Sequence, residues 1–248
     1  MRAYFFIFLF LNLFLFAQES FLLVNAHTNE TFVKVGSDIK RQVTPCCTFN
    51  IALSLMGFDS GIFQNQEEPV WDFQVGYVDD IETWRAPHNP ELWIKNSCVW
   101  YSQLLAEMLG TDRVQNYLEI LDYGNKDLSG GIDSFWLGST LKIAPYQQIK
   151  LLQKILFGDL PFSSNSIEKA KSLFFREELA FGWKLFGKTG YGTDGDQKVG
   201  WFVGWMERGD DLYIFSYNNL DITVDPYGSV PRAKELLMDA ISKERTSL

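Results

Sequence analysis

Strand-forming segments stand at both ends of this 248-residue chain, and helix-forming segments lie between them. Residues 20–35 alternate apolar and polar side chains around a turn at residues 29–30, which is typical of a β-hairpin. Three further strands are predicted at 182–189, 199–206 and 212–217, joined by turns rich in Gly and Asp. We therefore expect an α+β fold in which the hairpin completes one central antiparallel sheet, flanked by helices and packed beside a mostly helical lobe.

The middle of the chain carries apolar residues at helical spacing. Gly57 and Gly110 are expected to end helices, and Asn96 or Ser97 is expected to cap one. Residues 57–96 are rich in Pro, Trp, Asp and Gly, which predicts an irregular connection. The predicted helices are 51–56, 97–109, 112–121, 145–157, 166–175 and 232–243.

The first 17 residues have the composition of a targeting segment. Arg2 gives a basic start, residues 3–16 are almost entirely apolar, and Ala17 offers a small residue for cleavage. A membrane span usually needs about 20 apolar residues, so this segment is short for one. We expect residues 1–17 to be a signal peptide and 18–248 to be one secreted or periplasmic domain. An uncleaved N-terminal anchor is the alternative.

The net charge argues against two classes of partner. The chain has 22 basic and 31 acidic residues, a formal net charge of −9, and removal of Arg2 leaves 21 against 31, or −10. Such an acidic protein lacks the basic surface that nucleic acids require and has little attraction to anionic lipid. We expect no nucleic-acid partner and, after signal cleavage, no stable membrane span. A small-molecule ligand stays compatible with this charge.

Three cysteines, Cys46, Cys47 and Cys98, allow at most one disulfide in an exported chain. A bridge between Cys46 and Cys47 would close a strained ring. We therefore expect Cys46 to pair with Cys98 if their segments meet, which leaves Cys47 free. The two histidines, His27 and His88, are far apart in the sequence and there is no Cys-x-x-Cys pattern, so no metal site is predicted.

Four short motifs carry the chemistry that the sequence suggests. Residues Cys47–Asn50, Cys-Thr-Phe-Asn, precede an apolar helical run, where acyl-transferring enzymes that recognise penicillin carry Ser-x-x-Lys. The others are Ser97–Val99, Tyr123–Asn125 and Lys188–Gly190, and each alone is weak evidence, since a serine often caps a helix and Tyr-Gly-Asn is an ordinary turn. Their order and spacing together are far more specific.

This set of motifs resembles the class D β-lactamases, the oxacillinase family, which share their fold with penicillin-binding proteins. The resemblance implies hydrolysis of β-lactams through an acyl-enzyme, with a β-lactam or a D-Ala-D-Ala-like molecule as ligand. It extends from Phe21 to Ile241 and includes Pro45–Asp59, Asn96–Gln103, Tyr123–Ile132, Phe135–Leu137, Gly187–Gly190, Gly200–Trp205 and Pro231-Arg232.

The resemblance also implies roles for single residues around the nucleophile. Cys47 stands where the family has the serine that attacks the lactam carbonyl. Asn50 stands where the family has a lysine that reacts with carbon dioxide to give the carbamate used as general base. Ser97 matches a hydroxyl that relays protons, whereas Val99 and Trp136 match an apolar wall and an indole beside the carbamate. Without the carbamate, packing is the expected role of Trp136.

The resemblance implies a second group that binds the substrate. Lys188 and Thr189 match residues of the catalytic strand that help hold the substrate carboxylate, and Arg232 matches an arginine that binds it from the last helix. A surface ion pair is the alternative role for Arg232. The oxyanion hole would use backbone N–H groups of Cys47 and of the strand at Gly190-Tyr191.

Two departures from the family pattern change the expected chemistry. Asn50 has no amine, so the carbamate cannot form and no cofactor is expected, and an amide accepts no proton at useful pH. A general base contributes about 10²–10⁴ in rate, and the family uses one base for both half-reactions. A thiol is intrinsically nucleophilic, and its pKa is expected to fall at a helix N-terminus near Lys188. We expect slow covalent capture on Cys47 and poor turnover.

Three functions remain open from the sequence. The chain is an impaired or inactive β-lactam hydrolase, a penicillin-binding or sensing module that is acylated without release, or a remnant that has no ligand or binds peptidoglycan stem peptides. In the last case Cys47 is an inert buried thiol. Asn50 is expected only to satisfy polar groups left by the missing lysine.

Overall fold

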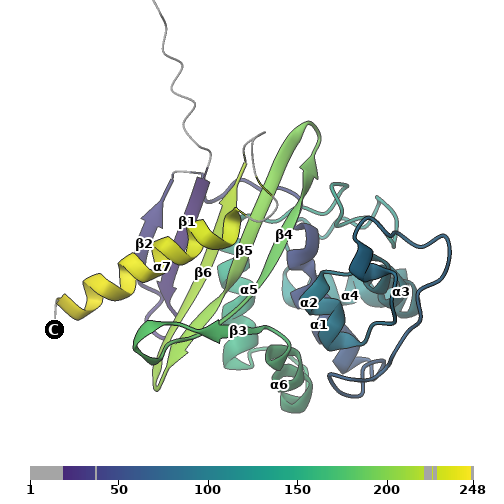
Figure 1. Ribbon diagram of the computed structural model, residues 1–248, viewed down its shortest axis with the longest axis horizontal. Helices are drawn as coiled ribbons and strands as arrows, with labels where there is room; N and C mark the ends of the chain where they lie inside the picture. Colours follow the sequence, from purple (N-terminus) through teal and green to yellow (C-terminus); the bar gives the residue numbers. More distant parts are fainter. Residues whose placement is uncertain (1–18, 37, 221–224, 226–227, 247–248) are drawn as a thin grey trace, which may run out of the picture.

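The computed structural model describes residues 19–36, 38–220, 225 and 228–246, in which a sheet and a helical lobe lie side by side (Figure 1). The predicted signal peptide at residues 1–17 lies outside the described residues. No helix within the described ranges is long and apolar enough to span a bilayer.

One six-stranded antiparallel sheet runs through the centre in the order β2-β1-β6-β5-β4-β3. The predicted hairpin is present, and its first strand pairs with β6 from the other end of the chain. The α+β fold expected from the sequence is therefore confirmed. The strands are β1 (Glu19–Asn25), β2 (Thr31–Val35), β3 (Phe175–Glu178), β4 (Lys184–Asp194), β5 (Gln197–Arg208) and β6 (Asp211–Asn219).

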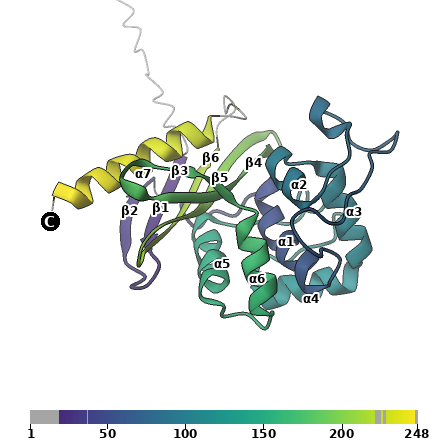
Figure 2. The same ribbon diagram turned by 60° about the horizontal axis from the view of Figure 1, so that its bottom comes forward.

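Helices cover both faces of this sheet. Helix α7 lies across one face, α5 packs on the other, and the remaining α-helices form the lobe beside β4 (Figure 2). The α-helices are α1 (Asn50–Asp59), α2 (Pro90–Asn96), α3 (Val99–Leu109), α4 (Thr111–Leu121), α5 (Pro145–Phe157), α6 (Ser164–Ser172) and α7 (Ser229–Thr246). Three 3₁₀ turns are η1 (Cys46–Phe49), η2 (Glu82–Trp84) and η3 (Ala180–Gly182).

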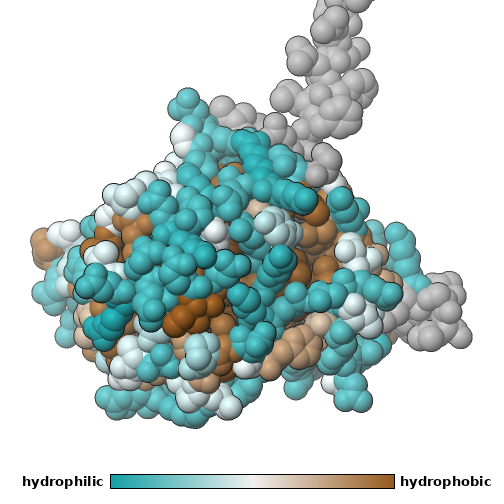
Figure 3. Space-filling view, turned by 180° about the vertical axis from the view of Figure 1, so that it is seen from behind, coloured by the Kyte–Doolittle hydropathy of each residue, from teal (hydrophilic) through white to brown (hydrophobic). Residues whose placement is uncertain are grey.

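Side-chain alternation along the strands divides the core in two. Trp201 and Trp205 of β5 face the helical lobe, whereas Phe202, between them, packs with Phe215 and Leu237 under α7. Fully burying one such side chain stabilises the fold by roughly 1.5–3 kcal/mol. Hydrophilic residues cover much of the surface seen from behind (Figure 3), in keeping with the acidic composition.

Helix α1 does not end at Gly57, as the sequence predicted, but continues to Asp59. A Cβ atom on Gly57 would lie 2.6 Å from a ring carbon of Phe63. This glycine therefore serves close packing against an aromatic ring and is not a helix stop.

The predicted irregular connection at 57–96 contains a helix, α2, at its end. The side chain of Asn89 accepts a hydrogen bond from the backbone N–H of Leu92 at 2.8 Å, and Pro90 occupies the first turn, so both ordinary start signals are present. Ser97 does not cap the next helix. It ends α2 in the left-handed conformation, with φ 51° and ψ 42°, and Cys98 precedes α3.

The helix predicted at 166–175 is shorter than expected, because α6 ends at Ser172 and Phe175 begins strand β3. The backbone N–H of Gly187 donates to the carbonyl of Phe174 at 2.8 Å, and the rings of Phe175 and Phe186 lie 5.5 Å apart. Pairing with β4 thus overrides the local preference for helix.

Candidate active site

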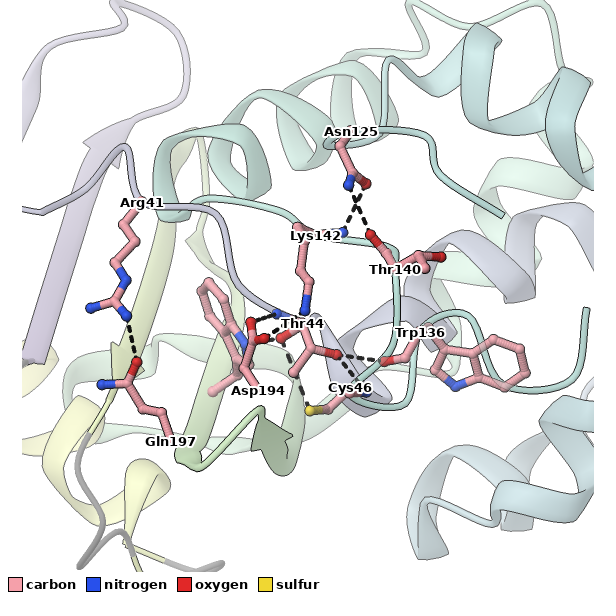
Figure 4. A network of polar contacts seen from close by, with 11 residues as sticks. Arg41, Thr44, Cys46, Asn125, Trp136, Thr140, Lys142, Asp194 and Gln197 are labelled. Atoms are coloured by element: carbon pink, nitrogen blue, oxygen red, sulfur yellow. Dashed lines mark hydrogen bonds and ion pairs between the residues drawn. The ribbon is translucent and has the colours of Figure 1, made fainter. Parts of the chain in front are cut away.

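The segment that leads into η1 is held by a polar network between the two halves of the fold (Figure 4). Thr44 donates through its hydroxyl to the carbonyl of Trp136 at 2.8 Å, and its backbone N–H donates to Asp194 at 3.0 Å. Asp194 in turn forms an ion pair with Lys142 at 2.6 Å. The indole of Trp201 donates to the carbonyl of Thr44 at 2.9 Å. These contacts fix the entry to η1 from β4, β5 and the loop before α5.

The Tyr123–Asn125 motif supports the same loop. The side-chain oxygen of Asn125 accepts from the backbone N–H of Lys142, and its amide group donates to the carbonyl of Thr140, both at 2.8 Å. Gly124 has a φ of +52°, and a Cβ there would lie 1.9 Å from the carbonyl oxygen of Lys142. The glycine is therefore required by a close backbone approach.

Strand β4 passes directly against η1. A Cβ on Gly190 would lie 2.9 Å from the carbonyl oxygen of Pro45 and 3.2 Å from the backbone nitrogen of Thr48. Cys47, between these two residues, is half-buried. The thiol-bearing turn and the Lys188–Gly190 motif are thus brought together, as the sequence predicted.

The structure also joins Lys188 to Ser97, which is 91 residues earlier in the chain. The buried Nζ of Lys188 donates to the hydroxyl oxygen of Ser97 at 2.5 Å and to the carbonyl of Thr189 at 3.0 Å. Burial lowers the pKa of Lys188 to about 8, a thiolate at Cys47 opposes this shift, and the positive charge of Arg176 adds to it.

The pKa of the Cys47 thiol does not fall, contrary to the expectation from the sequence. Burial raises the pKa of Cys47, and the charge of Lys188 lowers it by a smaller amount. A nearby cation and a helix N-terminus lower a thiol pKa, but removal of water from the thiolate raises it, and at Cys47 this desolvation is the largest effect.

Asn50 is fully buried in the first turn of α1. Its side-chain oxygen accepts a hydrogen bond from the hydroxyl of Ser102 at 3.2 Å, and its amide nitrogen has no hydrogen-bond partner in the described structure. The indole nitrogen of Trp136 is likewise buried without a partner, and its rings pack against Phe49 and Phe135. The side chain at position 50 offers no amine, so the carbamate of the family does not fit this site.

Arg232 is engaged by acidic side chains. Its guanidinium donates to both carboxylate oxygens of Glu19, at 2.9 and 3.1 Å, and to Glu235 at 2.8 Å. The hydrogen bond from Arg232 holds the pKa of Glu19 below its ordinary value. The structure thus shows the ion-pair role, and binding of a substrate carboxylate by Arg232 stays a prediction.

The remaining predicted site residues lie at the same place. Thr189, Gly190 and Tyr191 continue β4 beyond Lys188, and Val99 opens α3 two residues after Ser97. The side chains of Val99, Thr189 and Tyr191 are half-buried. Their roles in binding a ligand, and the oxyanion hole, stay predictions.

All three cysteines are free, so the predicted Cys46–Cys98 disulfide is wrong. The sulfur of Cys46 lies on the side of β4, where a Cβ on Gly192 would be 2.8 Å from it. Cys98 is buried at the start of α3. Within the described part of the chain, no three His, Cys, Asp or Glu side chains gather in a way that could hold a metal ion.

Sequence reasoning missed two residues of this site. Ser102 lies one helical turn after Cys98 and so shares its helix face, but its hydrogen bond to Asn50 joins α3 to α1, and no spacing along the chain indicates it. Arg176 directly follows the helix predicted to end at Phe175, and the sequence assigned it to no element. The structure places it on β3, where its positive charge influences Lys188.

Proteins of known family are similar to this chain over most of its length. The family model of the penicillin binding protein transpeptidase domain matches residues 20–241. β-Lactamase OXA-9 of Klebsiella pneumoniae is 35% identical over 211 residues, which cover 79% of this chain and 76% of OXA-9. The chain belongs to the class D β-lactamase family. The family predicted from the motifs is therefore confirmed.

Two further proteins are similar to this chain. The crystal structure of the class D β-lactamase OXA-427 matches with a TM-score of 0.84 at 33% identity, covering 92% of this chain and 99% of OXA-427. The methicillin resistance mecR1 protein of Staphylococcus aureus is 31% identical over 200 residues, which are 79% of this chain but 33% of mecR1. This class D chain thus keeps the family fold around a thiol and has an amide at position 50.

Proposed function

We propose that this class D β-lactamase-like protein captures β-lactams covalently on Cys47 and releases them slowly or not at all. The observation that carries the proposal is Asn50, a buried amide bonded to Ser102. Neither amide atom can accept a proton from a nucleophile near neutral pH.

The two half-reactions are affected unequally by this change. In acylation, the sulfur of Cys47 attacks the lactam carbonyl, the ring carbon–nitrogen bond breaks, and the thiol proton passes to the ring nitrogen, so no proton is gained or lost overall. In deacylation, a water molecule must attack the thioester, and that water needs a base in its path. A missing base typically slows a step by about 10²–10⁴, so the acylated form is expected to accumulate.

The ligand is a β-lactam or a D-Ala-D-Ala-like molecule that enters beside β4. Lys188 and Thr189 supply an amine and a hydroxyl on that strand, and Gly190 keeps the strand close to η1. Arg232 contributes to binding a carboxylate only if the ligand displaces Glu19. We further propose export through residues 1–17, so that capture takes place outside the cytoplasm.

A penicillin-binding sensor is the second candidate, and the likeness to the methicillin resistance mecR1 protein favours it. In a sensor the persistent adduct is itself the useful product, whereas in an impaired hydrolase it is a stalled intermediate. The two readings share the same site and differ in the lifetime of the thioester.

Intact-mass spectrometry of the purified protein with benzylpenicillin over time tests the proposal. We expect a gain of one penicillin mass that persists for hours and is absent in Cys47→Ala. Steady formation of penicilloate without an adduct would contradict the role given to Asn50. The absence of both adduct and product would identify a remnant without this ligand.

A further inference from the structure

Cys47 must lose a proton before or during attack, and the usual acceptor is missing at position 50. Two titratable side chains outside η1 are coupled electrostatically to Cys47: the charge of Lys188 acts on the Cys47 thiol, and a Cys47 thiolate acts on Cys98. Burial raises the pKa of Cys98 to about 12, so its thiol is not an acceptor at neutral pH. The remaining group with a basic nitrogen is Lys188.

We infer that Lys188, acting through the hydroxyl of Ser97, takes the proton from Cys47 and later delivers it to the leaving nitrogen. This inference rests on the proposed acylation of Cys47. It assigns to Lys188 of β4 the proton transfer that the resemblance gives to residue 50 in the family. Arg176 is then a positioning residue, because its charge keeps the amine of Lys188 able to accept the proton.

The surroundings of Lys188 favour a neutral amine. Its side chain is fully buried, and its hydrogen bonds go to two uncharged oxygens, those of Ser97 and Thr189. No carboxylate forms an ion pair with it in the described structure. A buried ammonium without a counter-ion is unfavourable, so the neutral form becomes accessible close to physiological pH.

Arg176 adds to this effect from the edge strand. Pairing between β3 and β4 shifts register between Phe175 and Glu177, which leaves Arg176 as the extra residue. Glu177 forms an ion pair with Lys234 of α7 at 2.8 Å, and within the described chain Arg176 itself makes no ion pair. Its positive charge acts on Lys188 and disfavours protonation of the amine.

The proposed step balances in atoms and charge. The amine of Lys188 receives the thiol proton by way of the Ser97 hydroxyl, and the sulfur of Cys47 forms a bond to the lactam carbonyl carbon. The carbon–nitrogen bond of the ring then breaks, and the ring nitrogen takes the proton back from Lys188 through Ser97. The products are a thioester, a ring-opened amine and the original neutral lysine.

The pH dependence follows from the groups around Lys188. Cys47 of η1 and Arg176 of β3 act on Lys188 electrostatically, Ser97 accepts its hydrogen bond from the α2–α3 corner, and its partner on β5 is the apolar Val203. With a pKa of about 8, the amine is protonated below that pH and cannot accept a proton. Reaction at Cys47 therefore accelerates as the pH rises through about 8. Removing the charge of Arg176 raises the pKa of Lys188 and moves this rise to higher pH.

Alkylation of Cys47 by iodoacetamide from pH 6 to 10, located by peptide mass spectrometry, tests the inference without a β-lactam. We expect Lys188→Gln to abolish the rise near pH 8 and to slow alkylation there about tenfold, the equivalent of one pKa unit. Ser97→Ala should slow it similarly. Lys184→Gln, an exposed position on the same strand, should leave the profile unchanged.

A second variant keeps the inference testable if Lys188→Gln does not fold. Arg176→Gln should shift the midpoint upward, and Arg176→Lys, which restores the charge, should return it toward the wild-type value. An unchanged profile in both Lys188→Gln and Arg176→Gln would overturn the inference. For Arg176→Gln alone, a lower midpoint would overturn it, since loss of a positive charge cannot ease deprotonation of the lysine.

The two proposals fail in distinguishable ways. If alkylation follows Lys188 but benzylpenicillin forms no adduct, the proposed function is wrong and the proton acceptor is correctly assigned. If the penicillin adduct forms but its rate of formation in Lys188→Gln keeps the wild-type pH profile, the proposed function is correct and the assignment of Lys188 as proton acceptor is wrong.

Discussion

The side-chain oxygen of Asn50 accepts a hydrogen bond from the hydroxyl of Ser102 at 3.2 Å inside the buried site. The same hydroxyl oxygen accepts from the indole of Trp93 at 2.8 Å and can alternatively donate to the carbonyl of Cys98, 3.4 Å away. Position 50 is therefore part of a structural contact between α1 and α3.

Asn50→Leu is expected to leave the free energy of unfolding unchanged or raise it by up to about 1 kcal/mol. The change removes an amide nitrogen that has no partner, and Ser102 still has the carbonyl of Cys98 to donate to. Ser102→Ala should instead cost about 1–3 kcal/mol, because it leaves the Trp93 indole and the Asn50 oxygen unpaired. Urea denaturation of both variants measures this difference. Equal destabilisation would show that the Asn50 amide has a partner after all.

Restoring the family residues should restore hydrolysis. The double variant Cys47→Ser with Asn50→Lys regains a hydroxyl and an amine, and in bicarbonate buffer we expect nitrocefin turnover about 10²–10⁴ times that of the unaltered chain. The same variant in carbon dioxide-free buffer is the control. Failure of the double reversal would place the defect elsewhere in the site.

The ion pair between Glu19 and Arg232 should make stability depend on acid pH. Because the pKa of Glu19 is lowered in the folded state, its contribution is present above the unfolded value of about 4.3 and is lost as the pH falls through the folded value. Glu19→Gln should lower stability at pH 7 by about 1 kcal/mol, and this difference should vanish at the acid end. Thermal melts from pH 7 to 3 measure it. A difference that stays constant over this range would exclude the ion pair as its source.

Thiol counting should separate the three cysteines. Without reductant and in denaturant, all three should react with Ellman's reagent, because none is bridged. In the native protein only Cys47, which is half-buried, should react readily, while Cys46 and Cys98 stay protected at 1% and 0% exposure. A count of one in denaturant would restore the disulfide that the sequence suggested.

The sequence predicted those parts of the fold where local pattern and tertiary role agree. The limits of α5 were predicted to the residue, since a proline opens it and a glycine follows it. The hairpin of β1 and β2 and the later strands followed from alternation of side chains. The proximity of Lys188 and Ser97 was predictable because the four motifs, taken together and in order, resemble one family specifically, although each motif alone is weak evidence.

The predictions that were wrong or incomplete depended on contacts between segments that are distant in the sequence. Strand β3 exists because β4 offers it an edge, and no local signal at Phe175 reports that. The ion pair between Arg232 and Glu19 joins residues near the two ends of the chain, and no local sequence pattern indicates such a contact. The direction of the pKa shift of Cys47 depends on how much water the fold removes from the thiol, a quantity known only once β4 is placed against η1.

The absence of a side chain on Gly190 limits which residues this position tolerates. A Cβ there would lie 2.9 Å from the carbonyl oxygen of Pro45, so any larger residue would have to displace η1 or the strand. This approach involves backbone atoms of Pro45 and Thr48, so exchanges of the side chains at positions 47 and 50 change the chemistry of the site without removing the approach itself.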